Sequence, residues 1–136
     1  MAMDRRHRRL FIGCANRLMA VVDADKGKVI TTLPIGEGVD ANAFDPKTEL
    51  AFSSNGDGTL TIVREVSPER FEVAGNVETA KGARTMALDP RTHRVYLVTA
   101  ELTAAPAPTS ENPHPRPGVA PGTFRLLVVE RDPSAP

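Results

Sequence analysis

The stretch that decides the fold is MALDPRTHRVYLV, residues 86–98. The same pattern occurs as NAFDPKTELAFSS at 42–54 and as MAMDRRHRRLFIG at 1–13. In each copy an apolar segment ends at an aspartate, a polar turn follows, and a second apolar segment begins. The aspartates of successive copies are 41 and 44 residues apart. This spacing indicates an internal repeat.

The repeat predicts antiparallel strands. Thr59 to Ile62 alternate between threonine and an apolar residue, which is the period of a strand. Asn55 to Gly58 favour a tight hairpin, and the Asp-Pro pairs at 45 and 89 favour type I turns. A repeat of about 40 residues built from such strands is typical of propeller blades. We therefore predict an all-β fold, a partial β-propeller of antiparallel four-stranded blades with one complete blade and two incomplete ones.

The chain is expected to form a single domain, 1–136, whose units lie at about 1–38, 39–82 and 83–131. With strands lettered a to d from the innermost outward, the first unit keeps only a stub of strand a and the third has no strand d. The expected strands after that stub lie at 9–13, 18–23, 28–35, 39–44, 50–54, 59–66, 71–79, 84–88, 94–99 and 124–130.

A proline-rich segment at about 100–123 interrupts the third unit. It holds six of the twelve prolines of the chain, a composition that resists helix and sheet formation. We expect a loop insertion between strands b and c, mobile from Thr103 to Val119.

Composition narrows the class of protein. The chain has 40% apolar and 25% charged residues and a formal net charge of zero, so no overall field attracts nucleic acid or an anionic bilayer. Cys14 is the single cysteine, which excludes an internal disulfide. Neither a membrane-spanning apolar stretch nor a convincing signal-peptide cleavage site is present. As written, the chain is expected to be cytoplasmic, without membrane association.

The segment RLFIGCANRLMAVVDADKGKVITTLPIG, residues 9–36, places three strands and their Asn and Gly turns in a recognisable order. Together with AFSSNGDGTLTIV (51–63), GARTMALDPRTHRVYL (82–97) and PGTFRLLVVER (121–131), it resembles the YVTN-type β-propeller repeat family, the YncE-like proteins. The resemblance covers nearly the whole chain and implies the fold, but propellers carry unrelated activities on one scaffold. Full-length members of the family are often periplasmic or secreted.

The resemblance is to a C-terminal portion of about three blades, since family members usually have about seven. Two interpretations stay open: the chain is a fragment of a larger propeller, or it completes its ring with other copies. In both cases unpaired strand edges and open blade faces are expected to be sticky. The expected partners are therefore the missing blades of a larger propeller, or copies of this chain, most simply in a two-fold dimer.

Turns of an antiparallel meander fall at alternate ends, so the b-to-c and d-to-a connections share one rim, here called the polar rim. The binding residues expected on this rim would surround the mouth of a central channel; they are Asn16, Glu37, Asp40, Asn55, Lys81 and Arg84. Asp40 and Arg84 each follow a glycine by two residues. They are expected either to form a polar binding site with the insertion as a flap, or to pair as ions between adjacent blades.

Catalytic motifs are absent from the sequence: there is no nucleophile elbow, phosphate loop or paired-carboxylate set. No cofactor and no metal site are expected, because the histidines and the cysteine show no ligand spacing; these are His7, His93, His114 and Cys14. The leading hypothesis is therefore a non-enzymatic binding or scaffolding module for an unknown small molecule or protein.

Two alternative functions stand beside this hypothesis. A lactonase-like metal-dependent hydrolase would use oxygen ligands such as Asp40, Asn42 and Asn55, but such a site needs contributions from most blades of a ring. Single-stranded nucleic-acid binding would use the basic run at 5–9. That run aligns with ordinary turns of the other repeats, and tryptophan is absent, so nucleic acid is not the expected partner.

Overall fold

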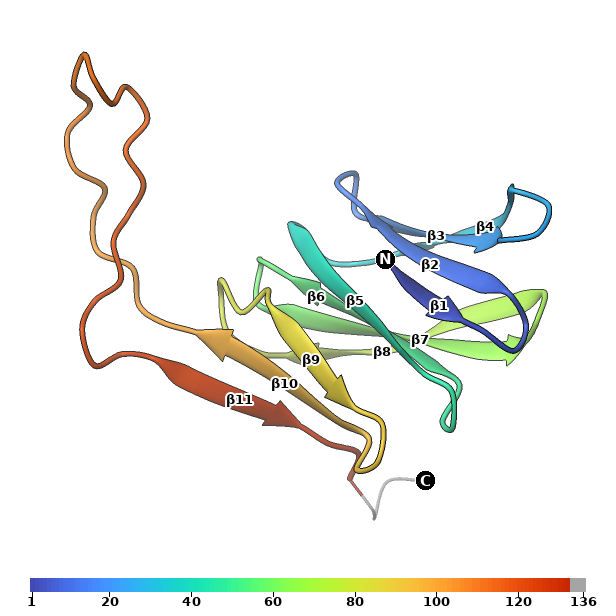
Figure 1. The fold of residues 1–136 in the computed structure, drawn as a ribbon. Helices are drawn as coiled ribbons and strands as arrows, with labels where there is room; N and C mark the ends of the chain where they lie inside the picture. Colours follow the sequence, from blue (N-terminus) through green and yellow to red (C-terminus); the bar gives the residue numbers. More distant parts are fainter. Residues whose placement is uncertain (133–136) are drawn as a thin grey trace.

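Three antiparallel sheets make up the fold of residues 1–132, the part of the chain that this computed structural model describes (Figure 1). The first contains β1 (Ala2–Asp4), β2 (Arg9–Cys14), β3 (Leu18–Asp23) and β4 (Lys28–Pro34). The second contains β5 (Val39–Asp45), β6 (Leu50–Asn55), β7 (Thr59–Ser67) and β8 (Arg70–Glu78). The third contains β9 (Met86–Asp89), β10 (Arg94–Thr99) and β11 (Arg125–Val129).

Each sheet is a meander of consecutive strands, and the first strands of the sheets, β1, β5 and β9, lie beside one another (Figure 1). The prediction of an all-β chain built as a partial propeller is confirmed, and the expected strands are present within two residues of their bounds. The first sheet does have an inner strand, but β1 spans three residues where β5 spans seven. None of the described residues forms a helix long and apolar enough to cross a membrane.

The turn after each inner strand has the same geometry in all three sheets. Asp4, Asp45 and Asp89 end their strands, and each accepts a hydrogen bond from the N–H two residues later, at 2.9, 3.0 and 2.9 Å. The fourth residue after each aspartate has a left-handed backbone, with φ of 59°, 57° and 61° at Arg8, Glu49 and His93. The repeat seen in the sequence is therefore a repeat of backbone conformation.

The first core lies between the first and second sheets. Phe11 is fully buried there, stacked on Phe44 of β5 at 5.1 Å between ring centroids and edge-on to Phe71 of β8 at 5.8 Å. The buried apolar residues of this core are Phe11, Met19, Val21, Ile35, Ala51, Val63 and Phe71.

The second core lies between the second and third sheets and consists of Phe52, Leu60, Ala83, Val95 and Leu97. Ala51 and Phe52 are adjacent in β6 yet belong to different cores, because successive side chains of a strand point to opposite faces. The second sheet is thus covered on both faces, and β6 is buried at every position after Leu50.

The proline-rich segment leaves the third sheet after β10 and returns at β11. Its two arms are joined by a bridge between Leu102 and Val119 and by the Ala120 N–H, which donates to the Glu101 carbonyl at 2.8 Å. The segment is almost entirely exposed and projects away from the sheets (Figure 1). Its mobility stays a prediction.

Phe11→Ala should lower the free energy of unfolding by about 3–5 kcal/mol, because it empties the centre of the first core. Urea unfolding followed by circular dichroism measures this loss. Leu102→Ala, at an exposed position of the insertion, is the control and should change stability by less than about 0.5 kcal/mol. Equal effects of the two substitutions would show that the first two sheets do not pack through Phe11.

Candidate functional site

The polar rim is held together by backbone hydrogen bonds between connections that are distant in sequence. The Gly56 N–H donates to the Gly38 carbonyl at 3.0 Å, and the Gly82 N–H donates to the Gly56 carbonyl at 2.9 Å. The Asp57 N–H donates to the Glu37 carbonyl at 3.2 Å. The b-to-c turn of the second sheet is therefore fixed between the two d-to-a connections that flank it.

Glycine is required at this junction for two reasons. Gly38 and Gly82 hold equivalent left-handed conformations, with φ of 72° and 80°. A Cβ atom added to Gly56 would lie 3.0 Å from Cδ of Arg84 and 3.3 Å from the Gly38 carbonyl oxygen. The result is a close-packed backbone surface from which only the flanking residues extend side chains.

Five of the six residues predicted for this rim are exposed: Asn16, Glu37, Asp40, Lys81 and Arg84. Glu37 and Lys81 directly precede Gly38 and Gly82 of the glycine junction, and the Arg84 side chain lies against Gly56. Asn16 lies in the turn between β2 and β3, and Asp40 lies at an irregular register position near the start of β5.

Asn55, the sixth residue, is fully buried. Its Nδ2 donates to the hydroxyl oxygens of Thr59 and Thr61, at 3.0 and 3.1 Å, and its Oδ1 accepts from the Ser53 hydroxyl at 3.1 Å. The side chain therefore secures the hairpin between β6 and β7 from inside the sheet and is not presented to a ligand.

Asp57, in the same hairpin, is a fixed negative charge on this rim. Burial alone would raise its pKa, but the N–H of Glu37, at 2.7 Å, and the hydroxyl of Thr59, also at 2.7 Å, donate to the carboxylate and lower the pKa below its ordinary value. The positive charge of Arg17 lowers the pKa of Asp57 further, so Asp57 stays ionised.

Neither Asp40 nor Arg84 forms an ion pair with another residue of the described range 1–132, so the expected pairing between adjacent blades is not formed. The Arg84 carbonyl instead accepts a hydrogen bond from the Ser54 hydroxyl. The insertion projects away from the sheets and does not lie over the rim as a flap (Figure 1).

The opposite rim carries ionisable groups at both junctions between sheets. At the second junction, Nδ1 of His93 lies 2.6 Å from Oδ2 of Asp45, which is fully buried. Burial works against the ionised form of Asp45, but the Lys47 N–H and the His93 imidazole more than offset it and hold the pKa of Asp45 below its ordinary value. This contact is an inter-sheet bridge with one acid and one histidine.

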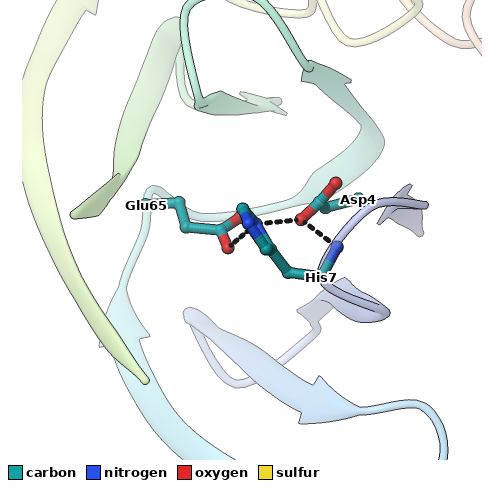
Figure 2. A group of neighbouring side chains, drawn as sticks. All are labelled: Asp4, His7 and Glu65. Carbon is teal, nitrogen blue, oxygen red and sulfur yellow. Dashed lines mark hydrogen bonds and ion pairs between the residues drawn. The ribbon is translucent and has the colours of Figure 1, made fainter. Parts of the chain in front are cut away.

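At the first junction two buried acids face one histidine (Figure 2). Nδ1 of His7 lies 2.8 Å from Oδ2 of Asp4 and 2.9 Å from Oε1 of Glu65. Asp4 and Glu65 are each 2% exposed. Neither carboxylate oxygen of Glu65 accepts a hydrogen bond, so its contact with His7 is an ion pair only. Burial and the charge of Asp4 raise the pKa of Glu65, while the charge of His7 lowers it, and the net direction is upward.

This group is not evident from the sequence, because Glu65 is remote from Asp4 and His7 in the chain. One signal was available: the second unit has a glutamate near the end of strand c, where the first unit has Ala24. The two positions are equivalent, because the N–H of Glu65 donates to the Glu49 carbonyl as the N–H of Ala24 donates to the Arg8 carbonyl. Asp4, His7 and Glu65 are the described residues whose ligand atoms could together hold a metal ion, all lying within 4.8 Å of one another.

A free strand edge completes the surface features. Within the described residues β11 pairs only with β10, and a groove lined by 77–79 and 126–130 runs along its other side. In the first two sheets the corresponding outer position is occupied by β4 and β8. The groove therefore marks the place of the strand d that the third sheet does not have.

Comparison with known proteins supports the fold and leaves the function open. No family model matches the chain, and no curated protein matches it. Among solved structures it is similar to dihydro-heme d1 dehydrogenase NirN in complex with DHE, with 17% sequence identity and a TM-score of 0.56. The match covers 70% of this chain and 20% of that chain. At this identity the likeness concerns the fold alone, which is propeller-like.

His93→Asn should lower the free energy of unfolding at pH 7 by about 1–3 kcal/mol, because buried Asp45 loses a partner. Asparagine tolerates the left-handed backbone at this position, so the imidazole contact is the main loss. The folded-state pKa of Asp45 is depressed, so its contribution is present above the unfolded-state pKa of about 3.9 and is lost as the pH falls through the folded-state value.

The deficit of the variant should accordingly shrink in acid, which urea unfolding at several pH values between 7 and 2.5 would measure. Arg91→Ala is the control, since Arg91 is exposed and lies 3.8 Å from Asp89 in the equivalent turn of the third sheet. A deficit that grows as the pH falls would contradict the assignment.

Proposed function

We propose that this chain is a binding or scaffolding module that closes into a complete propeller with a second copy of itself. The observation that carries the proposal is the uncovered apolar face of the third sheet, here called the open face, which consists of Tyr96, Val98, Phe124, Leu126 and Val128. Phe124, Leu126 and Val128 are 68%, 57% and 50% exposed.

The open face is the counterpart of the faces that pack inside the chain. Tyr96 pairs with Val128 and Val98 with Leu126, so these side chains lie on one side of the sheet. The alternating residues Leu127 and Val129 pack on the second core. The sheet thus buries one apolar face and leaves the other in water, as a terminal repeat without a cap does.

The other end of the chain offers a surface of the same kind. Leu10 pairs with Val22 and Ile12 with Ala20, on the side of the first sheet away from Phe11. Stacking this face on the open face of a second copy would repeat the sheet-on-sheet packing found within one chain. Two copies would supply twice the three sheets of one chain, which lies within the usual range of about four to eight blades.

Such a ring would bring the polar rims of both copies around one channel mouth. Glu37, Asp57, Lys81 and Arg84 would then supply ligand contacts of both signs on a rigid backbone surface. The repeats are assigned to the YVTN type because the strand and turn order of residues 9–36 resembles that family. Ligand recognition and scaffolding, and not turnover, are the functions that these groups support.

Light scattering at several protein concentrations tests the assembly. The unmodified chain should give a monodisperse species of twice the mass of one chain. Leu126→Glu should shift it to the monomer, because it places a charge in the centre of the open face. Leu102→Glu is the matched control, since Leu102 is 64% exposed but lies in the insertion, and this variant should assemble like the unmodified chain.

A monomer at every concentration would overturn the two-copy ring, and so would polydisperse material, which fits a piece of a larger propeller. Assembly that survives Leu126→Glu would show that the copies meet through another surface.

A further inference from the structure

We propose that Asp4, His7 and Glu65 bind one divalent transition-metal ion at the junction of the first and second sheets, with Zn²⁺ as the best-matched ion. The three side chains come from the end of β1, the turn after it, and β7 (Figure 2). Their ligand atoms already lie within 4.8 Å of one another. The site lies within one chain and does not depend on the assembly proposed above.

The charge balance of the junction points to a cation. Two carboxylates that are 98% withdrawn from solvent face a single imidazole, and Glu49 adds a further negative charge to the field at Glu65. His7 Nδ1 can donate one hydrogen, which the geometry directs to neither oxygen of Glu65 as a hydrogen bond. A buried carboxylate without a hydrogen bond is costly, and an ion between the three groups would satisfy it.

The residues that create this imbalance depart from the repeat. Asp4 has counterparts in Asp45 and Asp89, but His7 stands where the other turns have Thr48 and Thr92. Glu65 stands where the first sheet has Ala24. The turn and the fold therefore need neither the histidine nor the glutamate, and the two meet at one point.

The junction between the second and third sheets has no excess of buried carboxylates over histidines. Asp45 and His93 form a contact of one acid with one histidine there, and both carboxylate oxygens of Asp45 have hydrogen-bond partners. The first junction differs by one additional buried carboxylate, which is the group left without a hydrogen bond. The comparison isolates Glu65 as the residue in need of a ligand.

The donor set matches a transition metal better than calcium or magnesium. One imidazole nitrogen with two carboxylate oxygens suits Zn²⁺, and three protein ligands leave a fourth position for water. Tetrahedral ligands with bonds of about 2.1 Å lie about 3.4 Å apart. His7 is now 2.8 and 2.9 Å from the two acids, so it must move outward slightly, which its 23% exposed side chain permits.

Titration calorimetry of the chelator-treated chain with Zn²⁺ alone tests the proposal, at a concentration where the chain is a single species. One ion should bind per chain. His7→Thr and Glu65→Gln should each weaken binding by at least about tenfold, while His114→Asn, which removes an exposed histidine of the insertion, should bind like the unmodified chain.

Glu65→Gln keeps the shape of the side chain and removes the buried charge, so this variant should remain folded, as circular dichroism would show. Zn²⁺ should raise the thermal unfolding temperature of the unmodified chain but not that of Glu65→Gln. Absence of Zn²⁺ binding by the unmodified chain would overturn the proposal. Protonation of Glu65 would then account for the excess negative charge at this junction. Binding that persists in both His7→Thr and Glu65→Gln would place the ion elsewhere and also overturn it.

Discussion

A sheet of this repeat buries both of its faces only when another sheet lies on each side. The second sheet meets this condition, and its strand β6 is buried from Ala51 to Asn55, polar residues included. The first and third sheets each bury one face, against the second sheet, through Phe11 and Val95 respectively. Stability is therefore concentrated in the middle of the chain, and unused apolar surface is concentrated at its two ends.

The same stacking gives the two rims different chemistry. On the polar rim, backbone hydrogen bonds between Gly38, Gly56 and Gly82 connect the loops of neighbouring sheets. The side chains of Glu37, Lys81 and Arg84 beside them are exposed. On the opposite rim the sheets are connected through side chains, since Asp4 faces Glu65 of the second sheet and Asp45 faces His93 of the third. His93 balances this charge at one junction. Glu65 adds to it at the other, where a cation is the natural complement.

Strand positions and the number of sheets could be predicted from the sequence because alternation and turn residues act locally. The left-handed backbone at Arg8, Glu49 and His93 recurs in all three sheets, each time four residues after the aspartate that ends the inner strand. Side-chain partners could not be predicted in the same way. The turn pattern predicts Asn55 on the rim, but its hydrogen bonds to Thr59 and Thr61 of its own hairpin hold its side chain inside the sheet. Glu65 joins Asp4 only through the packing of two sheets, which no local pattern records.

The most direct test is amide hydrogen exchange across a range of protein concentrations. It measures whether the local stability of each sheet depends on how many of its faces are covered. Amides of β6 should exchange slowly at every concentration, because both faces of the second sheet are covered within one chain. Amides of β11 should exchange quickly in dilute solution and become protected as the concentration rises and a second copy covers the open face. Protection of β11 that equals that of β6 in dilute solution and does not change with concentration would contradict the account.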